Sequence, residues 1–432
     1  MIPRRFITVC ILSLVVLSGV GEAADPAAST DAVVHWNQTL LSIVRTPGAQ
    51  PATIHPTRSF AMMHAAIYDA VNAIDRRHNP YAVAFSGVSR RASQSAAAAV
   101  AAHDVLVALY PALASALDTD LRQSLSLVAD GADKTDGMRV GAAAAGAILR
   151  LRSADGALAP PVPYVFGTAP GDYQSTPPNF PSQPVFTHWS HVTPFALKRA
   201  DQFRPGPPPA LTSDRYGDAV EEVASVGTAG STSATADEAL TGRFWNGPIQ
   251  NYWNEIAQTA SQRRRLTTAQ NARLFALLNL SLADGVIAFY EAKYTYNLWR
   301  PVTAIRAADT DDNPDTILDP AWLPEVGNTA PDPAYPGAHA VISAAAEEVL
   351  VSVLERSHLD FDVSSEVLPG VQRSFNSLSA AAEEATLSRI FAGAHFRFDL
   401  TSGHRLGRDV ADFVLDHFLT PRRHDDGHDD RR

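Results

Sequence analysis

Two cations stand seven residues apart in the segment Lys293-Tyr-Thr-Tyr-Asn-Leu-Trp-Arg300-Pro301. Seven residues make nearly two turns of an α-helix, so both side chains would project from one face, about 10 Å apart along the axis. Long side chains can converge from there on one anion, lysine as a point charge and arginine as a planar fork. The alternative is a pair of solvated surface cations.

A second segment, Tyr335-Pro336-Gly337-Ala338-His339, comes just before an alanine-rich stretch that predicts a helix. Proline and glycine at this place leave backbone N–H groups exposed at a helix N-terminus, where the helix dipole also favours an anion. A histidine here can give or take a proton near neutral pH. The alternative is a helix-capping turn with an exposed histidine.

The third segment, from Ser388 to Asp399, holds a cation, a histidine and a carboxylate. Arg389 and His395 are six residues apart and would not share a face of a straight helix, but Ala392-Gly393-Ala394 suits a turn that brings both to one point. Asp399, four residues after His395, could bond the far ring nitrogen and so fix the tautomer of the imidazole. Asp399 could also cap the next helix.

Each of the three segments lies at a predicted helix end, which indicates one shared oxyanion pocket. The combined spacing of Lys-x6-Arg-Pro, Pro-x-x-His and Ser-Arg-x5-His-x3-Asp resembles the superfamily of vanadium-dependent haloperoxidases and type 2 phosphatidic-acid phosphatases. Segments 59–75, 194–211 and 290–306 look like bacterial members of the haloperoxidase branch. The resemblance covers most of the chain after the predicted leader.

This resemblance implies a role for each residue of the pocket. Lys293, Arg300 and Arg389 would neutralise the equatorial oxygens of the anion. His339 would be the acid–base residue. His395 would coordinate vanadium, or attack phosphorus in a phosphatase, with Asp399 behind it.

The second segment departs from the family pattern. The family reads Pro-Ser-Gly-His, whereas this chain reads Pro336-Gly337-Ala338-His339. Gly337 and Ala338 fall at positions that contact the anion in the family, yet the serine hydroxyl is missing and a Cβ stands where glycine is usual. The departure puts anion affinity and rate in question, but not the location of the site.

The resemblance implies vanadate as cofactor, with hydrogen peroxide and a halide as substrates and a hypohalous-acid equivalent as product. Two other functions are compatible with the same pocket. One is a secreted acid phosphatase with a phosphohistidine at His395, acting on phosphate esters because phosphate and vanadate share shape and charge. The other is a non-catalytic phosphate- or vanadate-binding protein. The sequence specifies neither the halide nor the oligomeric state.

The whole-chain composition limits the partners. The formal net charge is −11 over 432 residues, which argues against nucleic acid and anionic membrane. Arg4 and Arg5, the apolar run 6–20 and Gly21-Glu22-Ala23 predict an export signal over residues 1–23. The only cysteine, Cys10, lies in that run, so disulfides and thiolate chemistry are excluded after cleavage. No other stretch is expected to approach the length of a membrane span, and we expect a periplasmic or extracellular protein.

Apolar periodicity predicts an all-α helical bundle, and the resemblance implies that it is of the vanadium haloperoxidase and acid phosphatase type. Helices are expected at 60–74, 94–109, 137–151, 337–357, 374–389 and 400–419, and 267–299 is expected to be one long helix or a broken pair. Segment 158–211 is rich in proline and aromatic residues, which predicts an ordered crossover strap without long helices. We expect a helical region at 24–255 that includes the strap, a catalytic bundle at 256–420 and a disordered charged tail at 421–432.

Other polar residues have plainer interpretations. The segment Asp309 to Asn313 begins like a calcium loop, but Pro314 and Pro320 replace the required glycine and glutamate, which indicates a solvated loop. His64 and Asp69 are expected to make core-facing contacts between helices. Three aromatic residues near the pocket could line a halide site or simply pack in the core: Phe289, Tyr290 and Trp299.

Overall fold

The computed structural model describes residues 31–422. The predicted export signal with Cys10 lies outside the described residues, as does all but the start of the predicted tail. From Asp31 onward the chain packs as one unit, so the boundary expected near residue 255 stays a prediction.

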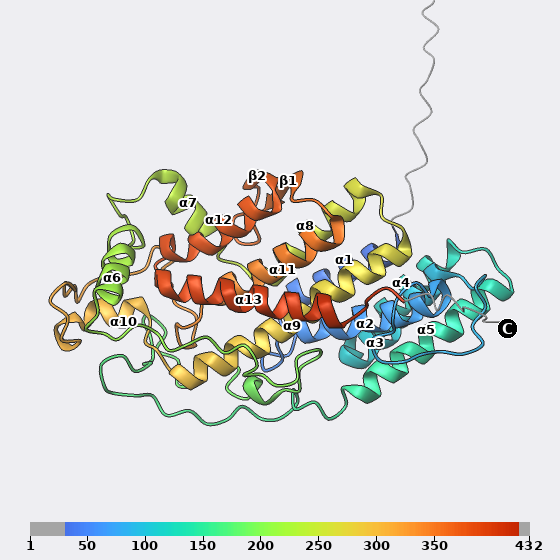
Figure 1. The fold of residues 1–432 in the computed structure, drawn as a ribbon, viewed down its shortest axis with the longest axis horizontal. Helices are drawn as coiled ribbons and strands as arrows, with labels where there is room; N and C mark the ends of the chain where they lie inside the picture. The colour runs from blue at the N-terminus through green and yellow to red at the C-terminus, as the bar shows by residue number, and fades with distance from the viewer. Residues whose placement is uncertain (1–30, 423–432) are drawn as a thin grey trace, which may run out of the picture. The chain divides into compact units, whose positions relative to one another are not determined.

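Helices dominate the described residues (Figure 1). The first half contains α1 (Ala32–Arg45), α2 (Pro56–Asp75), α3 (Gln94–Leu109), α4 (Ala114–Ser126), α5 (Ala132–Leu151), α6 (Asp214–Val226) and α7 (Ala236–Phe244), with short 3-10 helices η1 (Pro111–Leu113) and η2 (Trp189–His191). The second half contains α8 (Ile249–Arg264), α9 (Thr268–Tyr296), α10 (Pro301–Arg306), η3 (Ala308–Thr310), α11 (Ala338–Leu354), α12 (Leu378–Phe391) and α13 (Arg397–His417). The expected all-α bundle is therefore observed.

One antiparallel pair of strands, β1 (His358–Ser364) and β2 (Gln372–Ser377), joins α11 to α12. Sequence analysis expected a helix from residue 374, and this expectation was wrong for the first four residues. Phe361 and Phe375 face each other across the pair and are both buried, so the hairpin has an apolar face. The helix begins only after Ser377, whose side chain accepts the N–H of Ala380 at 3.1 Å.

The 29-residue helix α9 is the axis of the bundle and packs against α2, α11 and α13. It begins with a capping box in which Thr267 and Gln270 satisfy each other's backbone N–H groups. It ends at Tyr296, because Asn297 takes the left-handed conformation with φ 50°. The expected helix over 267–299 therefore stops three residues early, which changes the placement of Arg300.

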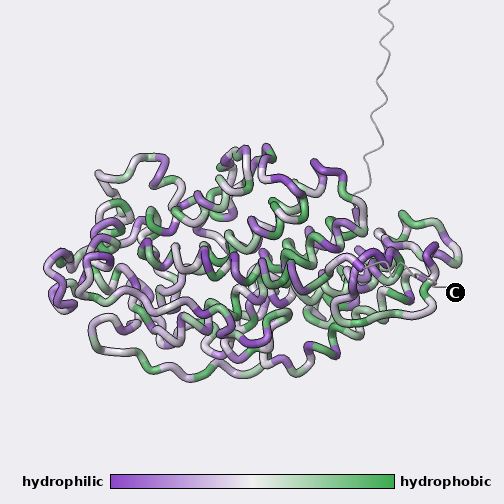
Figure 2. The backbone as a smooth tube through the Cα atoms, viewed as in Figure 1, coloured by the Kyte–Doolittle hydropathy of each residue, from purple (hydrophilic) through white to green (hydrophobic). Residues whose placement is uncertain are grey.

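Helix α9 is also long and apolar enough to cross a membrane, so the expectation that no other stretch reaches that length was wrong. Within residues 31–422 it is the single helix that passes this test, unless the bent pair formed by α3 and the segment 111–126 is counted as one span. Of the apolar window of α9, 94% is buried inside the protein. Figure 2 shows hydrophobic and hydrophilic residues mixed along the helices of the bundle.

The chain between α5 and α6, which contains the proline-rich segment 158–211, forms no helix or strand other than the short η2. Asp284 in the middle of α9, which is fully buried, ties this segment down by accepting the N–H groups of Phe195, Ala196 and Leu197 at 2.6–2.7 Å. Farther along α9, the hydroxyl of Tyr294 donates to the carbonyl of Val185. The proline-rich segment thus lies against the helix that carries Lys293.

Helices α11 and α13 pack closely along their lengths. Gly403 and Gly407 stand one turn apart on α13, and a Cβ on either would clash with backbone carbonyls of α11 or its N-cap, those of Gly337 and Val341. Only glycine allows this approach. The close contact brings the start of α13, with Asp399, to the start of α11, with His339.

Candidate oxyanion site

An apolar cluster separate from the main core holds the three motif segments together. Each segment contributes an aromatic residue next to its motif: Trp299 precedes Arg300, Tyr335 precedes Pro336 and Phe396 follows His395. All three aromatic side chains are at most 3% exposed. The cluster consists of Tyr216, Ala219, Val220, Val223, Leu298, Trp299, Val302, Ala304, Ile305, Trp322, Ala334, Tyr335, Ala340, Ile390, Phe396, Phe398 and Leu400.

Lys293 lies in the last turn of α9 and is fully buried. Its ammonium donates to the carbonyls of Pro333 and, at 3.2 Å, of Ala334, and lies 3.5 Å from Oδ1 of Asp332. Burial lowers its pKa to about 8, and the negative charge of Asp332 opposes that shift. Lys293 is therefore a buried cation and not a solvated surface residue.

Arg300 is the N-cap residue of α10 and is 1% exposed. Lys293 and Arg300 were expected to share one face of a helix, and this expectation was wrong. Helix α9 ends at Tyr296, and the backbone of Arg300 is extended, with φ −87° and ψ 157°. Its guanidinium nevertheless meets Lys293 at a common partner. Nε donates to the carbonyl of Asp332 at 2.7 Å and Nη2 donates to its carboxylate.

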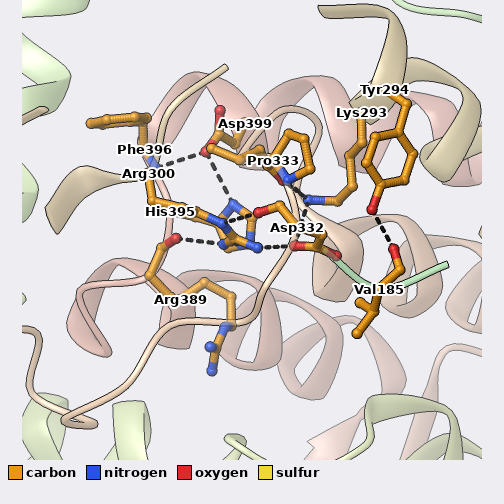
Figure 3. A network of polar contacts seen from close by, with 12 residues as sticks. Val185, Lys293, Tyr294, Arg300, Asp332, Pro333, Arg389, His395, Phe396 and Asp399 are labelled. Carbon is orange, nitrogen blue, oxygen red and sulfur yellow. Dashed lines mark hydrogen bonds and ion pairs between the residues drawn. The ribbon is translucent and has the colours of Figure 1, made fainter. Parts of the chain in front are cut away.

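That common partner, Asp332, was missed by the sequence analysis. Its carboxylate lies between Lys293 and Arg300, and the residue is 5% exposed (Figure 3). The only signal was its position four residues before Pro336, inside the loop that carries the second motif. The two cations are thus already paired within the protein.

His395 follows α12 and is 4% exposed. Its Nδ1 lies 3.0 Å from Oδ2 of Asp399, and its Nε2 lies 3.0 Å from Nη1 of Arg300. An arginine N–H can only donate, so Nε2 is the acceptor and Nδ1 carries the proton that Asp399 receives. Burial, followed by the charge of Arg300, lowers the pKa of His395 well below its usual value, which keeps the ring neutral.

Asp399 combines the two roles that the sequence left open. Its Oδ2 also accepts the N–H of Phe396 at 3.0 Å, one of the unpaired donors at the start of α13. The residue is fully buried, which raises its pKa to about 7. It therefore orients the imidazole and caps the helix with one oxygen.

The turn expected between Arg389 and His395 is present. Helix α12 ends at Phe391, and Gly393 has a positive φ of 73° at a place where a Cβ would clash with the carbonyl of Gly227. The N–H groups of Ala394 and His395 both return to the carbonyl of Arg389, at 2.9 and 3.2 Å.

Arg389 differs from the other two cations because most of its donors have no partner. It is 6% exposed, and Nη2 donates to Oδ1 of Asn246 at 3.2 Å. Among residues 31–422, Nε and Nη1 find no acceptor, and no dashed contact reaches this side chain in Figure 3. Burial and then the charge of Arg300 lower its pKa to about 10. A buried guanidinium with spare donors is a fitting partner for an anion.

His339 lies in the first turn of α11 and is partly exposed. Its Nε2 lies 2.9 Å from the carbonyl of Trp245, which can only accept, so the proton is on Nε2 and Nδ1 has a free lone pair. Desolvation, followed by the charge of Arg389, lowers its pKa well below the usual value. A charge on His339 would also lower the pKa of His395, so the two rings belong to one site.

The N-terminus of α11 offers fewer donors than its sequence suggested. The N–H of Gly337 donates to the carbonyl of Asp399 at 3.0 Å, so this amide is engaged by the protein. Ala338 begins the helix proper, and its amide is one of those that have no partner within an α-helix. Gly337 itself has φ −74° and ψ 116°, a conformation open to any residue.

The remaining polar candidates are structural. Nε2 of His64 lies 2.9 Å from Oδ1 of Asn37 on α1, and Asp69 accepts three N–H groups of residues 81–83. Both were expected to make core-facing contacts between helices. His64 does so, whereas Asp69 contacts the loop that follows its own helix, so the expected contact between helices was wrong for Asp69. The three aromatic residues that were considered for a halide site, Phe289, Tyr290 and Trp299, are 2%, 4% and 1% exposed and belong to the two apolar cores.

Fold and site together define a helical bundle with a buried cluster of cations around the imidazole of His395. Residues 273–423 match the family model of the VCPO second helical-bundle domain. Vanadium chloroperoxidase from Curvularia inaequalis is 24% identical over 297 residues, which are 51% of this chain and 48% of that protein. The chain thus spans about half the length of this curated relative.

Solved structures agree with the sequence matches. The structure of the first bacterial vanadium-dependent iodoperoxidase has a TM-score of 0.75 and 27% identity, covering 91% of this chain and 97% of that chain. The apo-type bacterial vanadium-dependent chloroperoxidase has a TM-score of 0.63 and covers 85% and 93% of the two chains. Its identity of 16% supports the fold alone. The predicted resemblance to vanadium-dependent haloperoxidases is confirmed, together with the all-α bundle.

Proposed function

We propose that the protein is a vanadate-dependent haloperoxidase that oxidises a halide with hydrogen peroxide. The observation that carries this proposal is the state of His395: a neutral ring with its Nε2 lone pair turned toward the cations and its Nδ1 proton held by Asp399. That is the tautomer and orientation required of an imidazole that binds a metal centre through Nε2.

The residues of the site fit vanadate on an independent ground, the unpartnered donors of Arg389. His395 would bind the vanadium, Arg389 would donate to the oxygens, and Lys293 and Arg300 would supply further positive charge. No cluster of three His, Cys, Asp or Glu side chains that could hold a metal ion occurs among residues 31–422, and an oxyanion held by one histidine requires none. Bound vanadate would supply the Lewis-acid centre that activates hydrogen peroxide toward a halide.

The side chains have distinct tasks in this proposal. Asp399 accepts a hydrogen bond from the Nδ1 proton of His395 and so keeps Nε2 unprotonated. His339 would accept a proton at Nδ1, since Nε2 already donates to Trp245. The low exposure of His395 and Arg389 keeps bulk water from competing for the anion, which strengthens each charge-assisted bond. The proposed export signal at residues 1–23 would place this activity outside the cytoplasm.

An acid phosphatase is the second candidate, because the same Nε2 lone pair is a nucleophile and the same donors suit a phosphoryl group. The test is chlorination, bromination and iodination of monochlorodimedone with hydrogen peroxide, with and without orthovanadate, beside p-nitrophenyl phosphate hydrolysis. Vanadate-dependent halogenation supports the haloperoxidase. Phosphate release without halogenation would favour the phosphatase, and neither activity would leave an oxyanion-binding protein.

A further inference from the structure

Oxygen atoms of the loop that carries the second motif accept most of the hydrogen bonds that Lys293 and Arg300 donate. Lys293 is surrounded by oxygens of the consecutive residues Asp332, Pro333 and Ala334. Arg300 gives two of its donors to Asp332, and Nη1 faces both the carbonyl of Ala394 and Nε2 of His395. A bound oxyanion would need the same donors.

The carboxylate of Asp332 resembles one edge of an oxyanion. It carries a negative charge and accepts from Nη2 of Arg300, with the ammonium of Lys293 at 3.5 Å from the same oxygen. The residue is 5% exposed, so water screens this charge weakly and its effect on a neighbouring anion is strong. Burial, followed by the charge of Asp332, raises the pKa of Tyr290 and Tyr294.

Arg389 shows what the pocket looks like without such a partner. Its Nε and Nη1 have no acceptor among the described residues, and its contact with Asn246 is to a neutral amide. The three cations that sequence analysis grouped together are therefore of two kinds. Arg389 is free to bind an anion, whereas Lys293 and Arg300 share the carboxylate of Asp332, whose single negative charge offsets one of their two positive charges.

We propose that Asp332 is a resident counter-anion of the pocket, which competes with a bound oxyanion for Lys293 and Arg300 and so weakens and tunes its binding. This inference rests on the proposed oxyanion site. It makes Asp332 a specificity-determining residue, since a fixed carboxylate disfavours every additional negative charge on the bound group. A structural ion pair that only fixes the loop would have the opposite consequence, because its loss would disorder Lys293 and Arg300 and weaken binding.

Asp332→Asn separates the two cases, because the amide keeps an oxygen for Arg300 and removes the charge. The probes are orthovanadate at low micromolar concentration and, separately, inorganic phosphate, in equilibrium dialysis at pH 6, where Lys293 is protonated in the native protein. Asp332→Ser is the second charge-free variant in case the amide variant does not fold, and circular dichroism melting checks each protein. Asp309→Asn removes one negative charge from an exposed position and is the matched control.

We expect the dissociation constants of both oxyanions to fall about tenfold or more in the two Asp332 variants, as loss of one close, poorly screened like charge requires, and to stay unchanged in Asp309→Asn. If the folded Asp332 variants bind the two oxyanions as the native protein does, or more weakly, the proposal that Asp332 is a counter-anion is overturned. If native protein binds vanadate in that case, the proposed function survives. Oxyanion binding in the Asp332 variants alone would support the counter-anion role of Asp332 and contradict the vanadate dependence of the native protein. Oxyanion binding in none of the proteins would overturn both the counter-anion role and the proposed function.

Discussion

Arg300 donates through Nη1 to Nε2 of His395 across 3.0 Å. This contact and the one from Nδ1 to Asp399 together fix the tautomer of the imidazole, with its proton on Nδ1. The same arginine also binds Asp332. Arg300 thus connects the residue that would bind vanadium with the carboxylate that would oppose its anion.

Removing Asp399 should impair the site through the orientation of His395. For Asp399→Ala we expect vanadate affinity to fall about ten- to hundredfold, the usual effect of losing the partner of a ligating histidine. Asp399→Asn should retain most of the affinity, because its amide oxygen can still accept from Nδ1 and from the N–H of Phe396. The measurement is vanadate titration of both variants. If the two variants lose the same vanadate affinity, the negative charge of Asp399 is what matters, and the hydrogen bond that orients His395 is not.

Lys293 should make oxyanion binding depend on pH. Its pKa is lowered to about 8 by burial, and a bound anion favours the protonated form, so its contribution is complete below that pH and is lost as the pH rises through it. Lys293→Met keeps the volume and removes the charge. We expect native protein to bind vanadate about ten- to hundredfold more tightly than this variant at pH 6, with the ratio approaching one by pH 10.

Taking the ratio of the two affinities at each pH cancels the protonation of vanadate itself, which is common to both proteins. A ratio that stays constant from pH 6 to pH 10 would contradict the assigned titration of Lys293.

Arg389 and Arg300 should differ sharply although both are buried arginines of one pocket. Arg389→Met leaves only Oδ1 of Asn246 without its partner, so we expect weaker vanadate binding, by about ten- to hundredfold, with little change in melting temperature. Arg300→Met leaves the buried carboxylate of Asp332 with Lys293 as its one cationic partner, at 3.5 Å, and should destabilise the fold by about 1–3 kcal/mol. Thermal denaturation and vanadate dialysis of the pair provide the comparison. A large loss of stability in Arg389→Met would mean that its role is structural.

Gly337→Ser should tighten oxyanion binding by about tenfold, through one hydroxyl donor to a charged acceptor. The backbone permits serine, since φ is −74°. The added Cβ would lie 3.0 Å from Cδ2 of Leu400, the mobile end of a side chain, and 3.4 Å from the carbonyl oxygen of Asp399. Gly337→Ala carries the same Cβ without the hydroxyl and should show no gain. If serine and alanine behave alike, the hydroxyl bonds Asp399 and not the anion.

The sequence predicted the local geometry around the candidate site well where a motif is short. Arg389, Gly393, His395 and Asp399 lie within eleven residues, so the turn at Gly393 and the contact between His395 and Asp399 follow from spacing and from the conformational range of glycine. Most helices were also predicted, because their apolar periodicity is long and regular.

Pairing across the chain could not be predicted in the same way. Asp332 meets Lys293 and Arg300 from a loop without periodicity, and Asn246 meets Arg389 from a segment with no motif. The position of the break, at Asn297, was missed because this residue adopts the left-handed conformation less often than glycine does. The engaged amide of Gly337 depends on the packing of α13 against α11, which is a property of the folded bundle.

The central claim, that His395 is the residue that binds vanadium, is tested most directly by the vanadium content of matched proteins. Native protein and His395→Ala would be incubated with orthovanadate, dialysed together and analysed for vanadium per chain, with circular dichroism to show that both are folded. The account predicts one vanadium per native chain and none above background in the variant, because the substitution removes the sole protein–vanadium bond it contains. Equal vanadium in the two folded proteins would contradict it.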